Sequence, residues 1–321
     1  MKRKYWLLAI LLGMSLAVSG CSSSSEEPKE VVSTEEAGTS EASEEVESAE
    51  DTAETETQET DDEEAETEET SETNAAVTIE EQVLVDQDGI KITAMDYVTD
   101  GFMGDGVKLL VENNTDTDYT IGCDALIVND YMITDLFVCD VAAGKKSNEV
   151  MYLSSAALKA AGITNVGKIE MYFHAYDADW TNLFQKVYSE IQTSAYDSMD
   201  TTPDDTGMEL YSENGIRIVG KTVDENSFWG TAILLYCENT SGQNVGISVE
   251  NMSINGFMMT PYYTAEVYDG KKSIDEITIL SSELQDNGIE SIEEVELKFH
   301  LYNVDTYETI ADSDTITFSA K

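Results

Sequence analysis

The second part of this sequence repeats an earlier part at a constant spacing, which constrains the fold more than any other feature. Gly89 matches Gly215, the stretch Gly-Lys-Lys-Ser at 144–147 recurs at 270–273, and Phe173-His174 matches Phe299-His300, each pair 126 residues apart. Two copies with so long a period indicate two whole domains rather than a solenoid. We expect these domains at 77–196 and 208–321, joined by a polar linker at 197–207 that few contacts cross.

Inside each copy, apolar residues alternate with polar ones, as in half-buried β-strands. Val107, Leu109 and Val111 show the pattern in the first copy, and the second copy has the same pattern at 295–301. The pairs Asn129-Asp130 and Asn255-Gly256 separate β-prone runs, which favours tight hairpin turns. About seven strands are expected in each copy.

One short helix is expected in each copy, at Ser155–Ala161 and Ser282–Asn287, each with a serine N-cap and a glycine just past its end. A single helix cannot supply the crossovers of a parallel sheet. The sequence therefore predicts an all-β chain of two tandem immunoglobulin-like β-sandwich domains, each with one short helix.

The N-terminus has the pattern of an export signal. Basic residues at 2–4 precede an apolar run that is too short to be read as a membrane-spanning helix. The run ends in Val18-Ser19-Gly20-Cys21, which resembles the lipobox of bacterial lipoproteins. By that resemblance, residues 1–20 are a signal peptide and Cys21 is lipidated and anchored in a bilayer. The alternative is an ordinary secretory signal with a chance cysteine.

Residues 21–76 differ in composition from the rest. They hold 22 acidic residues and a single lysine, Lys29, and most of the others are Ser, Thr or Ala. Such a stretch cannot bury enough apolar surface to fold, and its like charges repel one another. We expect a disordered acidic tether, with specific binding of cations or of a basic partner as the alternative.

The remainder, 77–321, has 43 acidic and 13 basic residues, a net charge of −30. This charge argues against nucleic acid as a partner and against adhesion to anionic lipid headgroups.

A resemblance to a known group of proteins follows from the repeated motifs. Glu-Asn, Asn-Gly-Phe-Met, Gly-Lys-Lys-Ser, Gly-Ile and Phe-His-x-Tyr together look like the tandem domains of uncharacterised surface lipoproteins of Gram-positive bacteria, and are loosely similar to immunoglobulin-like domains of secreted bacterial antigens. The resemblance implies a β-sandwich and an extracytoplasmic location, and it brings no catalytic residues. The first copy departs from the pattern with Asp130 in place of Gly256, which weakens the turn prediction there.

The Gly-Lys-Lys-Ser stretches lack the leading glycine of a phosphate-binding loop, and strands follow them rather than helices. We interpret them as turns and expect no nucleotide. The alternative is that Lys145, Lys146, Lys271 and Lys272 contact an acidic wall polymer.

Cysteines and histidines suggest no site. If the hairpin turns on Asn129-Asp130, Cys139 faces Thr120 and Cys123 faces Leu136, so that the two cysteines point to opposite faces and form no disulfide unless a bulge intervenes. His174 and His300 are expected on the outer face beside Tyr176 and Tyr302. One histidine per copy is too few for zinc, and no Gly-x-Ser-x-Gly is present.

Two weaker binding candidates remain. Asp177, Asp179 and Asn182 are the best place for a calcium ion, although no twelve-residue calcium loop is present and no other cofactor is expected. Trp180 and Trp229 are expected in loops, where they would stack on a sugar ring or a peptide, or else cap the core. Their counterparts are Thr306 and Met103, so neither tryptophan is shared by both copies.

Three functions are consistent with this sequence. The first is a non-enzymatic surface lipoprotein that presents two binding domains to a cell-wall glycan or an envelope protein. The second is a structural accessory subunit of an envelope complex, which should have an apolar patch. The third is a wall-polymer or glycan hydrolase, which needs a cleft with converging carboxylates of perturbed pKa.

Overall fold

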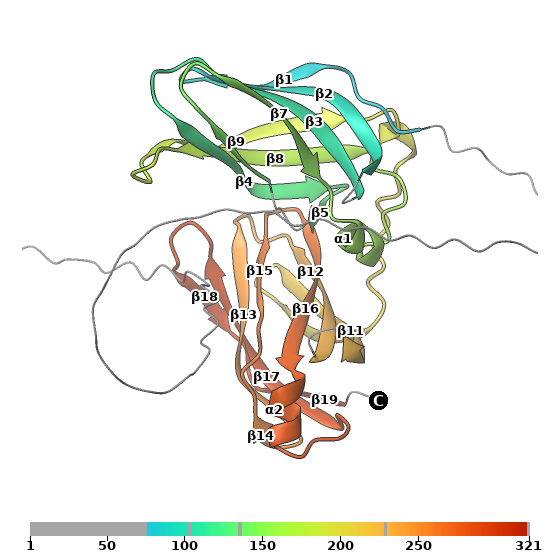
Figure 1. The fold of residues 1–321 in the computed structure, drawn as a ribbon. Helices are drawn as coiled ribbons and strands as arrows, with labels where there is room; N and C mark the ends of the chain where they lie inside the picture. Colours follow the sequence, from blue (N-terminus) through green and yellow to red (C-terminus); the bar gives the residue numbers. More distant parts are fainter. Residues whose placement is uncertain (1–75, 102–103, 134–136, 228–229, 320–321) are drawn as a thin grey trace, which may run out of the picture. The chain divides into compact units, whose positions relative to one another are not determined.

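A computed structural model describes residues 76–101, 104–133, 137–227 and 230–319 (Figure 1). They belong to one compact unit, Thr70–Lys321. Strands dominate, two short α-helices are present, and the described strands form three sheets: a four-stranded sheet in the first repeat, a six-stranded sheet in the second, and a nine-stranded sheet to which both repeats contribute. The prediction of an all-β chain with tandem sandwiches is confirmed. The predicted signal peptide, the predicted lipidation site Cys21 and residues 22–75 of the predicted acidic tether lie outside the described residues.

The first repeat packs a four-stranded sheet, in the order β1-β2-β3-β7, against a second sheet in which β4 pairs with β5 and β6 on one side and with β8 on the other, followed by β9. Its elements are β1 (Gln82–Gln87), β2 (Ile90–Gly101), β3 (Gly104–Asn113), β4 (Tyr119–Val128), β5 (Tyr131–Ile133), β6 (Val138–Val141), β7 (Lys146–Tyr152), α1 (Ser155–Ala160), β8 (Lys168–Tyr176) and β9 (Asn182–Gln192).

The second repeat has the same order, except that two short strands stand in place of β9. After the short 3₁₀ helix η1 (Tyr196–Ser198), its elements are β10 (Met208–Glu213), β11 (Ile216–Ser227), β12 (Gly230–Asn239), β13 (Val245–Ile254), β14 (Phe257–Met258), β15 (Thr264–Val267), β16 (Lys272–Leu280), α2 (Ser281–Asp286), β17 (Glu294–Asn303), β18 (Thr309–Asp312) and β19 (Ile316–Ser319). The strands of both repeats outnumber the predicted seven, because very short strands such as β5, β6, β14 and β15 leave no periodic signal.

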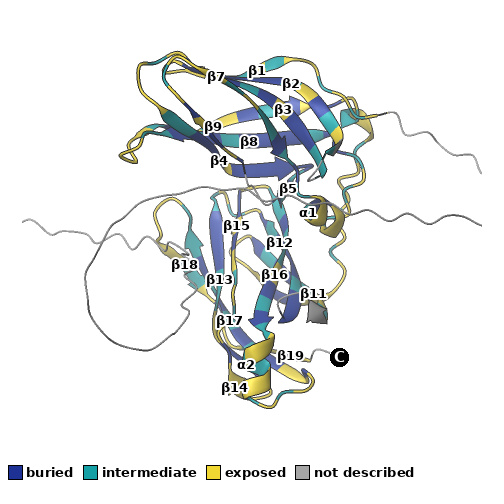
Figure 2. Ribbon diagram, viewed as in Figure 1, coloured by how far each residue is buried: buried dark blue, intermediate teal, exposed yellow. Residues whose placement is uncertain are grey.

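The alternating residues form the cores, as Figure 2 shows by the burial along the strands. Val107, Leu109 and Val111 of β3 are fully buried, and so are Val295, Leu297 and Phe299 of β17. Burying one such side chain stabilises the fold by about 1.5–3 kcal/mol. The hydrophobic effect on one face of each strand therefore fixes which side of each sheet faces inward.

One buried asparagine per repeat ties three chain segments together. The Asn113 amide nitrogen donates to the carbonyls of Thr117 and Val141, while its oxygen accepts from the Thr115 amide and hydroxyl. Asn239 makes the corresponding four bonds, to Gln243, Val267 and Ser241. Both side chains are almost fully enclosed. The asparagine of each matching Glu-Asn pair thus holds the loop that follows it closed against a distant strand end.

The hairpin turns are alike in both repeats. Asn129 and Asp130 have φ of 48° and 68°, and Asn255 and Gly256 have φ of 50° and 83°. Asp130 therefore does not disturb the turn, because aspartate adopts the left-handed region more readily than most residues. The weaker expectation for this turn was wrong.

The helix caps differ between the repeats. The Ser154 hydroxyl accepts a hydrogen bond from the Ala157 amide and caps α1, but Leu280 stands at the N-cap of α2 and makes no such bond. The predicted serine cap of the second helix was wrong. Gly162 and Gly288 both lie just past the ends of the helices, as predicted, and both have positive φ.

The argument that Cys123 and Cys139 point to opposite faces was also wrong. Strand β4 pairs with β5 in the expected register, but it pairs with β6 one residue out of that register, so that Cys139 faces Ile121. Both cysteines consequently lie in the core of the first repeat. No disulfide joins them, and the Cys123 thiol contacts the Ala125 carbonyl oxygen at 2.9 Å.

The two repeats are in direct contact through a small number of residues. The β4–β5 hairpin reaches the second repeat, where Tyr131 pairs with Lys272 of β16 in parallel and the Lys272 amide donates to the Asp130 carbonyl at 2.9 Å. Tyr131 is 3% exposed and lies in one hydrophobic cluster with Val219 and Tyr236. The hairpin tip is thus covered by the second repeat.

An ion-pair cluster accompanies this contact. Lys271 Nζ lies 2.9 Å from Asp130 Oδ1 and 2.5 Å from Glu170 Oε2, and Lys168 pairs with the same two carboxylates. Beside the cluster, Tyr172 and Tyr268 meet edge to face with centroids 5.0 Å apart. Burial raises the pKa of Asp130, but the hydrogen bonds and charges of Lys168 and Lys271 outweigh burial and lower it. The junction between the repeats therefore combines a cluster of two lysines and two carboxylates with a contact between two tyrosine rings.

We expect Asn113→Ala and Asn239→Ala each to lower the free energy of unfolding by about 2–3 kcal/mol, because each leaves several buried groups without partners. Urea unfolding of the fragment 70–321 measures the change. Asn148→Ala, an exposed asparagine on β7, is the matched control and should change stability little. Equal effects in all three variants would contradict a special role for the buried asparagines.

We expect Asp130→Asn to destabilise the fragment at pH 7 and to have little effect in strong acid. The folded-state pKa of Asp130 lies below its ordinary value of 3.8, so its ion pairs contribute stability above that value and lose it as pH falls through the folded-state pKa. Thermal unfolding from pH 7 to pH 2, with Asp86→Asn as an exposed control, measures the difference. A difference from the unmodified fragment that is independent of pH would contradict the ion-pair contribution.

Candidate functional site

A row of aromatic rings lies on the outer face of the first repeat. His174 and Tyr176 of β8 stack with ring centroids 5.7 Å apart and planes 23° apart, and Tyr176 stacks on Trp180 at 4.8 Å and 15°. Trp180 is 75% exposed. The prediction that the histidine shares an outer face with Tyr176 is confirmed, and the structure adds Trp180 to the same stack.

The second repeat has the same arrangement at the equivalent place. His300 and Tyr302 of β17 stack at 5.8 Å and 23°, and Tyr302 stacks on Tyr307 at 6.2 Å and 15°. Tyr307 is 79% exposed. Each repeat therefore ends its stack with an exposed aromatic ring, which we call the terminal ring (Trp180 or Tyr307).

The loop behind each terminal ring is held by one side chain. Asp177 Oδ1 accepts from the amides of Asp179 and Thr181, and Asn303 Oδ1 accepts from the amides of Asp305 and Thr306. The residue that carries the terminal ring itself has a positive φ, 60° at Trp180 and 57° at Tyr307. Because the second loop is one residue longer, Trp180 corresponds in space to Tyr307 and not to Thr306.

Polar residues flank each stack in a row across the sheet. In the first repeat, Asp140, Thr120, Tyr176 and Asn182 pair in register on four neighbouring strands. In the second, the row is Glu266, Gly246, Tyr302 and Thr309. Each row thus places a carboxylate on one side of the tyrosine and an amide or hydroxyl on the other. Hydrogen-bonding groups beside an exposed ring are the usual elements of a small-molecule site.

A glycine on the neighbouring strand makes room for the rings. A Cβ atom at Gly122 would collide with the His174 ring, and one at Gly246 would collide with the Tyr302 ring. The rings therefore lean across the adjacent strand rather than standing away from the sheet.

Each histidine is fixed by a carboxylate. His174 Nδ1 lies 2.8 Å from Asp124 Oδ1, and His300 Nδ1 lies 2.6 Å from Asp312 Oδ1. Burial raises the pKa of Asp124, but hydrogen bonds from His174 and the Lys186 amide outweigh it, so the pKa lies below its ordinary value. Asp124 is consequently an ionised partner that orients the ring of His174.

The two candidate tryptophans fare differently. Trp180 lies in the loop between β8 and β9, as expected, and its large exposure shows that it does not cap the core. Trp229 lies outside the described residues. Sequence comparison missed Tyr307 because the constant spacing fails by one residue in this loop. The signal available was an aromatic residue after an Asp or Asn turn in both copies.

The four candidate lysines occupy matching turns, as predicted: the Lys145 amide donates to the Ala142 carbonyl, and the Lys271 amide donates to the Tyr268 carbonyl. Strands β7 and β16 begin at Lys146 and Lys272, the second lysine of each turn. Lys146 pairs with Glu112, Lys271 lies in the ion-pair cluster of the junction, and Lys272 lies over the Tyr131 ring. Lys145 is exposed.

The calcium site stays a prediction. The Asp177 carboxylate already accepts two backbone amides, and the neutral Asn303 does the same work in the second repeat. Within the described part of the chain, no three His, Cys, Asp or Glu side chains form a group suited to a metal ion.

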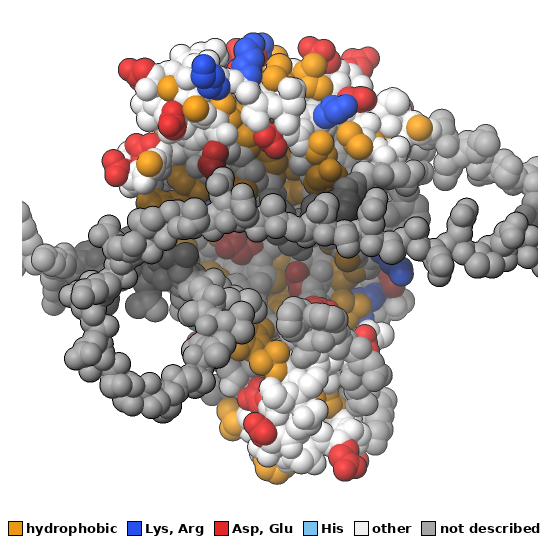
Figure 3. Space-filling model, in the orientation of Figure 1, with side chains coloured by type: hydrophobic (Ala, Val, Ile, Leu, Met, Phe, Trp, Pro, Cys, Tyr) orange, Lys and Arg blue, Asp and Glu red, His pale blue; other side chains and the backbone are white. Residues whose placement is uncertain are grey.

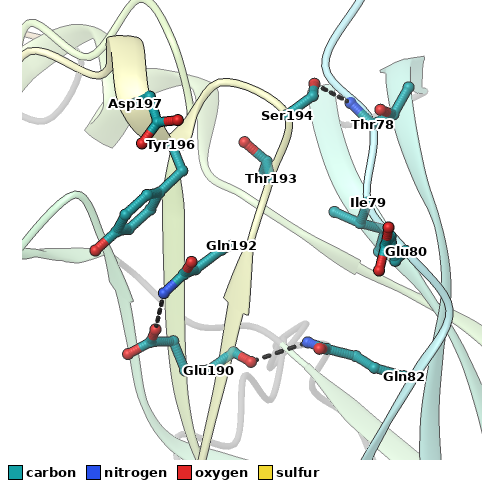
Figure 4. Close-up of a pocket in the computed structure, with 10 residues that line it drawn as sticks. All are labelled: Thr78, Ile79, Glu80, Gln82, Glu190, Gln192, Thr193, Ser194, Tyr196 and Asp197. Carbon is teal, nitrogen blue, oxygen red and sulfur yellow. Dashed lines mark hydrogen bonds between the residues drawn. The ribbon is translucent and has the colours of Figure 1, made fainter.

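A hollow of about 720 Å³ in the first repeat is open and polar. It lies between the segment 78–82 and the end of β9 (Figure 4), where the Thr78 amide donates to the Ser194 hydroxyl and the Gln82 side chain donates to the Glu190 carbonyl. Hydrogen bonds from Gln192 and Tyr188 lower the pKa of Glu190. A hydrolytic general acid needs a raised pKa. With its lowered pKa, the Glu190 carboxylate instead accepts hydrogen bonds in this hollow.

Comparisons with known proteins add little. No protein-family model matches the chain, and no curated protein matches it. Among solved structures, the chain is similar to the SafA pilin in complex with the SafB chaperone from Salmonella enterica, with 11% identity over 67% of this chain and 88% of that one, and a TM-score of 0.21. A protein of unknown function from Porphyromonas gingivalis W83 gives 9% identity, 67% and 89% coverage and a TM-score of 0.19. Such low TM-scores support no conclusion, so the fold is established by the strand pairing itself.

No helix in the described part of the chain is long and apolar enough to cross a membrane.

Proposed function

We propose that the chain is a lipoprotein anchored through Cys21 on the extracytoplasmic face of a Gram-positive cell membrane, and that its two sandwiches bind a cell-wall glycan without catalysis. The observation that carries the binding proposal is the aromatic stack, which recurs in both repeats and ends each time in a ring more than 70% exposed. The anchor and the location are supported by the lipobox-like sequence alone.

An exposed ring on a rigid sheet suits a sugar. Its apolar face packs against the C–H face of a sugar ring, and the flanking carboxylates and amides accept and donate hydrogen bonds to hydroxyl groups. The terminal rings lose little conformational freedom on binding, because the stacks and the Asp177 and Asn303 turns already hold them.

The charge of the surface favours a neutral glycan over a phosphate-rich polymer. The net charge of −30 beyond the tether repels anions. Three of the four lysines in the Gly-Lys-Lys-Ser turns are engaged by Glu112, by Asp130 and Glu170, or by the Tyr131 ring. These lysines therefore offer little free positive charge to an acidic polymer.

The accessory-subunit alternative is favoured by a different observation. Phe257, Met258 and Tyr262 of the second repeat are 47%, 63% and 61% exposed, and an exposed apolar patch is typical of a protein interface.

We expect the fragment 70–321 to pellet with purified cell-wall sacculi and to saturate. Trp180→Asn and Tyr307→Asn remove a terminal ring while tolerating the positive φ at each position, and each should weaken binding about tenfold, the effect of losing about 1.4 kcal/mol. Tyr262→Asn, at an exposed tyrosine outside the stacks, is the control. Parallel assays with calcium and with a chelator test the Asp177 site.

Undiminished pelleting of a fragment that carries both Trp180→Asn and Tyr307→Asn would overturn the aromatic site, and absence of pelleting by the unmodified fragment would favour a protein partner. Lipidation is tested separately by labelling cells with a radioactive fatty acid, which Cys21→Ser should abolish.

A further inference from the structure

The hairpin that joins the two repeats has a second copy that the described structure leaves uncovered. In the first repeat, the tip of the β4–β5 hairpin is buried by the second repeat, and Tyr131 is 3% exposed. The equivalent tip of the β13–β14 hairpin carries Phe257 and Met258, which are 47% and 63% exposed. Figure 3 shows hydrophobic side chains at the surface of this end of the second repeat.

The surface that receives the first hairpin is duplicated as well. Within the chain, the tip contacts the Gly270–Ser273 turn and the start of β16. The equivalent turn, Gly144–Ser147, leads into β7, which is the edge strand of its sheet. Lys145 and Lys146 there are exposed. Within the described residues, one chain therefore presents a hairpin tip on its second repeat and a receiving turn on its first that are exposed, although Lys146 of this turn pairs with Glu112 of its own repeat.

The charges of the two surfaces are complementary. Within the chain, Lys271 lies between the carboxylates of Asp130 and Glu170. On the second hairpin, Gly256 replaces Asp130, but on the neighbouring strand β17 Glu296 stands in the place of Glu170 and Glu294 in the place of Lys168. Two carboxylates are therefore present for one lysine, although Glu296 also accepts hydrogen bonds from the Ser253 and Thr317 hydroxyls. Lys145 is the equivalent lysine on the first repeat.

We propose that copies of this chain associate head to tail, with the β13–β14 hairpin tip of one copy docked on the Gly144–Ser147 turn of the next, as the β4–β5 tip docks on the Gly270–Ser273 turn within one chain. Such a contact joins two different surfaces, so it extends into a row of copies instead of closing as a symmetric dimer. The contact lacks the Tyr268 and Tyr236 equivalents, which are Ala142 and Leu110, so it is weaker than the junction within the chain.

Sedimentation velocity of the fragment 70–321 tests the proposal at concentrations up to about 1 mM, where weak contacts between proteins become populated. The average sedimentation coefficient should rise with concentration, and Phe257→Asp should abolish the rise. Val83→Asp, which places the same charge on an exposed residue of β1, should not. A single species of constant size at all concentrations would overturn the proposal, and so would association that Phe257→Asp leaves intact.

A charge reversal tests the pairing itself. Lys145→Glu should weaken association, and combining it with Glu294→Lys should restore it, because lysine is the residue that the first repeat has at the position of Glu294. Failure of the double variant to recover would show that these residues do not face one another.

Disulfide crosslinking detects the proposed contact even when the association is weak, because the bond captures the pair covalently. A mixture of Lys146→Cys and Phe257→Cys fragments should form a crosslinked pair on oxidation, whereas Lys146→Cys mixed with Val83→Cys should not. Tyr131→Cys with Lys272→Cys, which are paired within one chain, is the positive control. Crosslinking in the control alone would contradict the proposed contact.

Discussion

The loop closure made by the buried asparagine is the constraint on which each sandwich depends. Asn113 and Asn239 end the strands β3 and β12 and hold the following loop and the end of β6 or β15 at once. A buried amide that lost these partners would be costly, so the loop has one favourable conformation. That conformation sets where β4 and β13 begin, and these strands carry the hairpin tip at one end and the glycines beside the aromatic stacks at the other.

The alternation of apolar and polar residues was sufficient to predict the fold class, but it was insufficient to predict the contact between the two repeats. Alternation in β3 and β17 predicts which residues are buried, since burial of one strand face is a local property of the sequence. The position of Lys271 between Asp130 and Glu170 depends on how two sandwiches meet, and no local pattern encodes that. The same lysine in the first repeat, Lys145, is exposed, although the two turns have the same sequence.

The site was predictable in part for a similar reason. Trp180 was recognisable as a loop residue, although its exposure was not predicted, and His174 with Tyr176 was recognisable as an outward pair. Tyr307 was hidden by a one-residue difference between the two loops, because a constant spacing aligned it with Thr181. The structure nevertheless shows that Trp180 and Tyr307 correspond, because both lie in a turn where one side-chain oxygen accepts hydrogen bonds from two backbone amides.

The segment between the repeats is secured by basic side chains. Lys221 donates to the Asp204 carbonyl, Arg217 pairs with Asp205, and Lys272 donates to the Thr201 carbonyl. Proteases cut most readily where a loop can leave the surface and enter an active site in extended form. A connection fastened at three points resists such entry, so the two halves of the chain should stay joined in the presence of proteases.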